Sequence, residues 1–306
     1  MSLRHPFGQR RTARLIAAVP FLWLGLFFLA PFVMVLRIAL SDAATALPPY
    51  APHFEGFAAL RDFLAGLDLE NFGLILEDPL YWQSYLFSLR IAALTTLIAL
   101  AIGYPLAYAM ASAPKRWRTI LLVLVILPFW TSFLIRVYAW IGILRPEGLL
   151  DMALAALGLS GQPLRLLNTE AAVLIGMVYS YLPFMVLPLY ATLEKLDRSL
   201  LEAAADLGAT PLRAFLTVTL PLSLPGILAG SALVFIPAIG EFVIPDLLGG
   251  PDTTMIGKVL WTEFFSNRDW PLASAVAVVL LVVLVLPLAL LQRARLARAG
   301  EGGGAA

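Results

Sequence analysis

The stretch LEAAADLGATPLRAFLTVTLP, residues 201–221, is the most strongly patterned part of the chain and lies between two long apolar segments. Gly208 can adopt the left-handed backbone conformation that commonly ends a helix. Thr210 and Pro211 follow, a pair that supplies an N-cap and a first-turn proline for a new helix. The pattern predicts a compact elbow made of two short helices.

The flanks of this stretch support the same interpretation. Ser199 and Glu202 have the spacing of a capping box, in which the hydroxyl and the carboxylate bind free N–H groups at the start of a helix. Alanines at 203–205 combine high helix propensity with little bulk, so another protein surface can approach this backbone closely. One face of the second helix is expected to pack through Leu212, Phe215 and Leu216.

The composition is that of a polytopic membrane protein. The 306 residues are 60% hydrophobic and only 13% charged, and the mean hydropathy is +0.87, whereas soluble domains carry about 25% charged residues. A net charge of +1 gives no reason to expect a nucleic-acid partner, and the absence of cysteine excludes disulfides and thiolate metal sites. With two histidines and no zinc motif, we expect no metal, no cofactor and no catalytic residues.

Long apolar runs predict an all-α protein with about six transmembrane helices. The expected spans are residues 15–40, 84–113, 119–144, 171–193, 223–248 and 271–291. They divide the chain into an N-terminal segment (1–14), a first helix (15–40), a loop (41–83), a helical core (84–291) containing the elbow region (194–221), and a tail (292–306). The first apolar run has no small-residue cleavage site after it, so we interpret it as a retained helix.

The distribution of charge predicts the orientation. Basic residues gather in 1–14, 114–118, the elbow region and 293–298, whereas the charged residues of loop 41–83 are mostly acidic. The positive-inside rule therefore places both termini and the elbow in the cytoplasm and loop 41–83 outside. A Gly226-x-x-x-Gly230 pair in the fifth span predicts close helix packing.

An ionisable residue at membrane depth is a candidate functional residue. Glu241 lies in IPAIGEFVIPDLLGG (236–250), where prolines free backbone carbonyls, and Asp246 follows it. These groups favour a positively charged solute. The alternative is a structural ion pair between Glu241 and Arg136. Aromatic side chains that can offer cation–π faces, or simply pack, are Phe129, Trp130, Tyr138, Tyr179 and Tyr181, with Trp140 nearby.

The elbow also carries a family resemblance. The matching positions are Glu202, Ala203, Ala204, Gly208, Ala209, Phe215 and Pro221. This order resembles the EAA loop of ABC-importer permeases, which implies a cytoplasmic element that couples the chain to a separate ATPase subunit. The chain has no phosphate-binding loop, since Gly257-Lys258 is followed by Val259 and lacks the earlier glycine. ATP is therefore expected to bind to a partner subunit. The alternative interpretation of the elbow is a plain linker between two membrane helices.

Longer strings narrow the resemblance. LPFWTSFLIRVYAW (127–140), AAVLIGMVYSYLPFMVLPLYATLEKLD (171–197) and IPAIGEFVIPDLLGGPDTTMIGK (236–258) are similar to spermidine/putrescine ABC-importer permeases, in particular to the first of their paired subunits. The similarity covers roughly residues 70–291. It implies a type I importer fold in a bacterial inner membrane, a second homologous permease, two ATPases, an extracytoplasmic solute-binding protein, and no enzymatic activity in this chain.

Other functions remain open from the sequence. A permease of the same fold for an opine, an aminophosphonate or ferric iron would share the elbow. An ATP-independent channel or secondary transporter would leave the elbow unexplained. A membrane enzyme is disfavoured because no cluster of histidine, cysteine or serine residues suggests chemistry.

Overall fold

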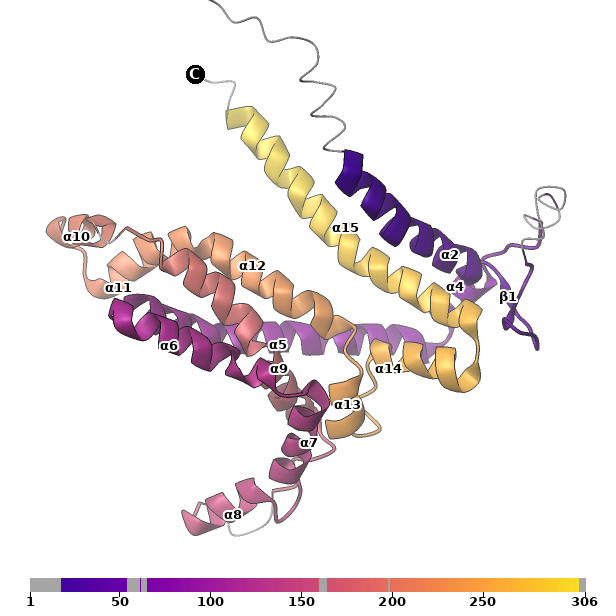
Figure 1. Cartoon of the computed structure of the whole chain (residues 1–306), viewed down its shortest axis with the longest axis horizontal. Helices are drawn as coiled ribbons and strands as arrows, with labels where there is room; N and C mark the ends of the chain where they lie inside the picture. Colours follow the sequence, from indigo (N-terminus) through magenta and orange to yellow (C-terminus); the bar gives the residue numbers. More distant parts are fainter. Residues whose placement is uncertain (1–17, 54–60, 62–64, 160–163, 198, 303–306) are drawn as a thin grey trace, which may run out of the picture. The chain divides into compact units, whose positions relative to one another are not determined.

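The computed structural model describes residues 18–53, 61, 65–159, 164–197 and 199–302, and the side chains of these up to residue 286 (Figure 1). The chain forms two compact units, one from residues 1–81 and 260–306 and the other from residues 82–259. Helices dominate both units. Among the described residues, the strands are those of a short hairpin in the first unit, in which β1 (Asp42–Ala43) pairs antiparallel with β2 (Tyr50–Ala51).

The first unit is built on two apolar helices that lie side by side (Figure 1). The helix Ala18–Ala39 contains a π-helical turn, η1 (Gly25–Leu29), and continues as α2 (Ala30–Ala39). Its partner is α15 (Trp270–Gly302). The short α4 (Glu70–Glu77) completes the unit, because the amide of its buried Asn71 donates to the carbonyls of Ala39 (3.1 Å) and Ser41 (2.9 Å). These bonds satisfy backbone groups that the end of α2 leaves free.

The second unit holds most of the helices. In chain order they are α5 (Pro79–Ser112), α6 (Lys115–Ile126), η3 (Leu127–Trp130), α7 (Phe133–Leu144), α8 (Leu149–Ala156), α9 (Glu170–Leu193), α10 (Ser199–Asp206), α11 (Pro211–Ala214), η4 (Phe215–Thr219), α12 (Leu220–Ile239), α13 (Val243–Leu248) and α14 (Ile256–Trp261). The π-helical turn η5 (Thr262–Asn267) leads from α14 back to the first unit.

Close packing of α9 against α12 organises the second unit. A Cβ atom on Gly226 would lie 2.6 Å from Oγ1 of Thr192, and one on Gly230 would lie 2.8 Å from Sδ of Met185 and 3.0 Å from its carbonyl oxygen. The expectation that these two glycines permit tight packing is confirmed. Small residues allow such close approach of helices where lipid offers no hydrophobic drive for association.

Four described helices are long and apolar enough to cross a membrane, and a fifth is counted if a bent pair forms one span. The helix Trp270–Leu286 is a shorter apolar segment at the sixth expected position. The third expected span is not one straight helix. Its two parts, Lys115–Trp130 and Phe133–Leu144, meet at 89°, where η3 ends and Thr131 adopts an extended conformation.

The fifth expected span, 223–248, had the wrong bounds. The helix starts at Pro211 and ends at Ile239, and α13 is a separate element. The elbow therefore continues directly into the membrane helix. Pro221 has no N–H to donate, and the preceding turn η4 widens so that the N–H of Leu220 bonds to the carbonyl of Phe215. Such π-helical turns let a helix absorb an irregular residue without ending.

The second expected span also begins earlier than 84. The helix α5 starts at Pro79, and the Asp78 carboxylate accepts a hydrogen bond from the N–H of Leu80 (2.8 Å). This is an acidic N-cap followed by a first-turn proline.

The third, fourth and sixth expected spans start at Lys115, Glu170 and Trp270, close to the predicted 119, 171 and 271. The predicted start of the first span at residue 15, like the N-terminal segment 1–14, lies outside the described residues. The helix α9 begins after Thr169, whose hydroxyl accepts from the N–H of Ala172 (3.3 Å).

The packing of α9 on α12 gives a stability prediction. Gly230→Val places a branched side chain against the backbone of α9, so we expect a fall in the apparent Tm of the detergent-purified protein of roughly 5 °C. Gly142→Val is the matched control, because nothing lies within 4 Å of a Cβ there. Equal melting temperatures for the two variants in a fluorescence-based thermal assay would contradict the packing described.

Candidate functional site

The elbow has the turn that the sequence predicts. The helix α10 ends at Asp206, and Gly208 follows with a φ of +81°. The N–H of Gly208 bonds to the carbonyl of Ala205 (2.8 Å), and that of Ala209 bonds to Ala204 (2.9 Å). These bonds satisfy carbonyls at the end of α10. The next helix is capped by the Thr210 hydroxyl, as expected, which accepts a bond from the N–H of Arg213 (3.4 Å).

The start of α10 differs from the expectation. The N–H of Ser199 donates to the carboxylate of Asp197 (3.0 Å), so Asp197 fulfils the role that the capping box gave to Glu202. The bond from this backbone N–H lowers the pKa of the Asp197 carboxyl below its usual value. The physical reason is position, since an acid two residues upstream reaches the first free N–H directly. Glu202 is left exposed at the elbow surface.

The outer face of the elbow is open. Ala203 and Gly208 are exposed, and Leu207 retains 90% of its accessible surface. Nothing lies within 4 Å of a Cβ placed on Gly208. Leu207 is therefore hardly packed within the second unit. Exposing a leucine side chain to water is unfavourable in free energy, because its apolar surface is not buried.

The packing face of the second elbow helix was only partly predicted. Phe215 packs edge-on against Tyr104 and Tyr108 of α5, with ring centroids 5.7 and 6.1 Å apart. The expectation that Leu212 and Leu216 share this contact is wrong, because both are exposed. The widened turn η4 starts at Phe215 and changes the helical register from there. Of the remaining matched positions, Ala204 and Ala209 are half-buried and Pro221 is exposed.

Beneath the elbow is a cavity of about 360 Å³. Its polar lining includes Arg118 and Glu194, which form an ion pair (Nη1 to Oε1, 3.2 Å), and Glu202. It is part of the same second unit as the elbow. The elbow therefore contacts α5 through the aromatic packing of Phe215, and beside this contact it borders a cavity of mixed polar and apolar lining.

A break in the chain between α12 and α13 positions Glu241. Its Oε2 accepts a hydrogen bond from the Tyr181 hydroxyl (2.6 Å), and its Oε1 accepts from the N–H groups of Val243 (3.0 Å) and Ile244 (3.4 Å). The carboxylate thus caps the N-terminus of α13, where backbone N–H groups and the helix dipole favour negative charge. Glu241 remains half-buried.

Part of the expected aromatic set lies with Glu241. Tyr181 contacts Phe184 (centroids 6.2 Å apart), and Phe184 contacts Phe129 (5.1 Å). The guanidinium of Arg136 lies 5.3 Å from the centre of the Phe129 ring. The ion pairs between described residues do not include one joining Arg136 to Glu241, so the alternative suggested by the sequence is wrong. A cation–π contact with Phe129 holds the arginine instead.

The other aromatic candidates lie elsewhere. Trp130 and Tyr138 are 78% and 58% exposed. Tyr179 packs on Trp140 (centroids 5.4 Å apart) and lines an apolar cavity of about 330 Å³ between α5, α6 and α9. Tyr179 and Tyr181 are two residues apart on a helix and so point in different directions. The structure brings Tyr181 and, through Phe184, Phe129 to Glu241.

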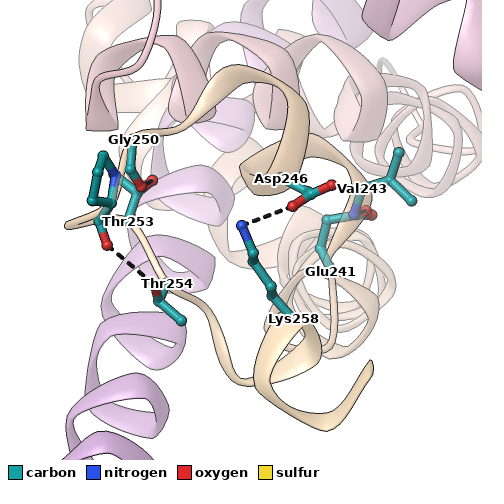
Figure 2. A network of polar contacts seen from close by, with 8 residues as sticks. Glu241, Val243, Asp246, Gly250, Thr253, Thr254 and Lys258 are labelled. Atoms are coloured by element: carbon teal, nitrogen blue, oxygen red, sulfur yellow. Dashed lines mark hydrogen bonds and ion pairs between the residues drawn. The ribbon is translucent and has the colours of Figure 1, made fainter. Parts of the chain in front are cut away.

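Asp246 has a partner that the sequence analysis missed. Its Oδ1 lies 2.7 Å from Nζ of Lys258, which reaches across from α14 (Figure 2). Between the two helices the chain turns at Gly250 and Thr253, where the Thr253 hydroxyl donates to the Gly250 carbonyl (2.7 Å). Lys258 is the only basic residue between Glu241 and Val259. A single basic residue in this stretch could have been singled out from the sequence as a candidate partner for a carboxylate. Its pairing with Asp246, however, is visible only in the structure.

Comparison with known proteins places this architecture in a family. Residues 103–298 match the model of the family described as "Binding-protein-dependent transport system inner membrane component". The chain is 42% identical over 281 residues to the spermidine/putrescine transport system permease protein PotB of Haemophilus influenzae, covering 92% of this chain and 93% of that protein. It is 46% identical to PotB of Escherichia coli over 226 residues, covering 74% and 82%.

Solved structures share the fold at low identity. A bacterial ABC transporter involved in the import of the acidic polysaccharide alginate aligns with a TM-score of 0.65 and 18% identity, over 93% of this chain and 96% of that one. The inward-facing MetNI methionine ABC transporter aligns with a TM-score of 0.53 over 73% of this chain and 98% of that one. The apolar helices, the elbow and these matches agree: the chain belongs to the family of inner membrane components of binding-protein-dependent transport systems.

Proposed function

We propose that this chain is the permease subunit of an ABC importer that takes up polyamines such as spermidine and putrescine across the bacterial inner membrane. The observation that carries the solute class is the similarity to PotB proteins, 42–46% identical over most of the chain. The carboxylates of Glu241 and Asp246 on the α12–α13 segment agree with a cationic solute. An anionic solute such as an aminophosphonate fits these carboxylates less well.

In this proposal the elbow couples the chain to an ATPase. Its open outer face, with Ala203, Leu207 and Gly208 exposed, suits docking into a groove of a partner protein. Glu202, also exposed, borders the cavity beneath the elbow. The partners are a second homologous permease, two ATP-binding-cassette subunits and an extracytoplasmic solute-binding protein. Nucleotide binds to the ATPases, since this sequence has no phosphate-binding loop, and the chain acts as a non-catalytic transport subunit. Both termini lie in the cytoplasm, as the basic residues predict.

The solute path is proposed to pass the α12–α13 break. There the Glu241 carboxylate, the Tyr181 hydroxyl and the Phe129–Phe184 rings come together. A carboxylate beside aromatic rings is the combination that binds an ammonium group through charge and cation–π contact. Tyr179, Trp130 and Tyr138 lie outside this cluster and keep a packing or interfacial role.

The coupling role of the elbow predicts the effect of Gly208→Asp. A side chain at a φ of +81° strains the turn, and the new charge lies on the docking face. We expect the variant to insert and fold but to lose at least about tenfold in solute uptake and in binding-protein-stimulated ATPase activity, a loss of more than 1.4 kcal/mol in coupling.

Gly158→Asp is the matched control for this experiment. Gly158 follows α8 with a φ of +69° and also has nothing within 4 Å of a Cβ. It carries the same strain and the same new charge at a turn away from the elbow, so its uptake is expected to stay near the wild-type rate. If the Gly208→Asp variant takes up solute at the wild-type rate with its ATPase bound, the elbow does not have the proposed coupling role.

The solute path predicts a second effect, on Glu241→Gln. The amide oxygen of glutamine can still accept the bonds from the N–H groups of Val243 and Ile244, and its NH2 group can donate to the Tyr181 hydroxyl oxygen. The cap on α13 is therefore kept while the charge is lost. We expect at least about a tenfold loss in uptake of a dication, with the ATPase still bound. The control is Glu170→Gln, which neutralises the exposed carboxylate paired with Arg90. Unchanged uptake by Glu241→Gln would leave Glu241 with a purely structural role.

A further inference from the structure

The ion pair between Lys258 and Asp246 is exposed on both sides. The Lys258 side chain retains 41% of its accessible surface and that of Asp246 retains 48%, with Nζ and Oδ1 2.7 Å apart. Ion pairs with this exposure contribute little to stability, because water and other ions compete for both partners. The Asp246 carboxylate is therefore open to exchange of one cation for another.

Packing of α14 places Lys258 close to the helix break. A Cβ on the neighbouring Gly257 would lie 2.4 Å from the carbonyl oxygen of Gly240 and 2.9 Å from that of Glu241. The N–H of Ile256 donates to Oγ of Ser88 (2.8 Å), which fixes the start of α14 on α5. The backbone that carries Lys258 thus touches the backbone that carries Glu241, while its side chain extends to Asp246 (Figure 2).

The charges of this segment do not balance. The segment contains two carboxylates, Glu241 and Asp246, and one ammonium group, that of Lys258, which pairs with Asp246. The described partners of Glu241 are neutral: a tyrosine hydroxyl and two backbone N–H groups. The guanidinium of Arg136 lies over the Phe129 and Phe133 rings. With Lys258 bound to Asp246, one negative charge lacks a cationic partner, and with Lys258 displaced, a dication would neutralise both.

The lysine side chain is itself a primary ammonium group on a four-carbon aliphatic chain, the same chemical group that ends an aliphatic polyamine. We propose that Lys258 is a tethered competitor of the solute: its ammonium occupies Asp246 when no solute is bound, and a terminal ammonium group of the solute displaces it. The inference rests on the proposed polyamine transport. Return of Lys258 to Asp246 would then weaken the hold on the solute and promote its release.

The test is a binding measurement on the purified permease–ATPase complex in lipid nanodiscs, with labelled spermidine and without the solute-binding protein. Lys258→Met keeps the length of the side chain and removes the competitor. We expect the dissociation constant for spermidine to fall about fivefold. This factor corresponds to losing an exposed ion pair whose strength is at the upper end of the usual range. Lys258→Arg retains the charge and is expected to bind spermidine no more tightly than the wild type.

A double-mutant cycle separates competition at Asp246 from a general effect of charge. In the Asp246→Asn background, Lys258→Met should give no gain in affinity, since the contested carboxylate is gone. An equal gain in both backgrounds would overturn the proposal, as would wild-type or weaker binding by Lys258→Met. Lys258→Gln serves in the same cycle if the methionine variant is unstable.

The outcome for the wild type separates this inference from the proposed function. If the wild-type complex binds spermidine and Lys258→Met does not alter the affinity, the competitor role fails and polyamine transport stands. If the wild-type complex neither binds nor transports any polyamine, while its ATPase responds to the solute-binding protein, the proposed solute fails and the competitor role fails with it.

Discussion

Where one helix ends and another begins, backbone N–H and C=O groups lose their helical partners, and the second unit depends on how the chain satisfies these groups between Ile239 and Val243. The Glu241 carboxylate binds the first free N–H groups of α13, and Tyr181 of α9 holds its other oxygen. Gly257 lets α14 approach the carbonyls at the same break. One charged side chain therefore caps the start of α13 directly after the break, and in the proposed function it is also where a cation is expected.

The helix that precedes this break links it to the elbow. Pro211 to Ile239 form one continuous helix of 29 residues, about 43 Å long at 1.5 Å per residue. Its first turn is capped by Thr210, two residues after Gly208, and its last turn ends beside Glu241. A displacement of the elbow by a partner therefore acts on a rigid element whose far end carries the candidate solute site. The close contacts at Gly226 and Gly230 pack this helix directly against α9.

Local rules predicted most of the elbow and failed where distant residues interact. The turn at Gly208 and the cap at Thr210 follow from conformational preferences of single residues. The start of α5 could have been predicted from Asp78-Pro79, which, like Thr210-Pro211, is an N-cap residue followed by a first-turn proline. Hydropathy alone placed this start at residue 84. Continuity through Pro221 was not predictable, because a proline usually signals a boundary and the widened turn η4 removes that conflict.

The candidate site shows the same division. Hydropathy identified Glu241 because a carboxylate in an apolar run is exceptional. Its true partners are Tyr181, 60 residues away, and the start of α13, whereas the suggested partner Arg136 lies on Phe129. Lys258, considered in the sequence only for a missing phosphate-binding loop, is brought to Asp246 by the return of the chain through α14. Pairings of this kind depend on tertiary packing, which one sequence does not reveal.

The most direct test of the whole account is uptake of labelled spermidine and putrescine into proteoliposomes that hold this chain with its paired permease and ATPase. The solute-binding protein is added outside and ATP is enclosed inside. The account predicts uptake that requires every component and that excess unlabelled polyamine abolishes. Stimulated ATP hydrolysis without polyamine uptake would contradict the proposed solute, and polyamine flux without ATP would contradict the coupling through the elbow.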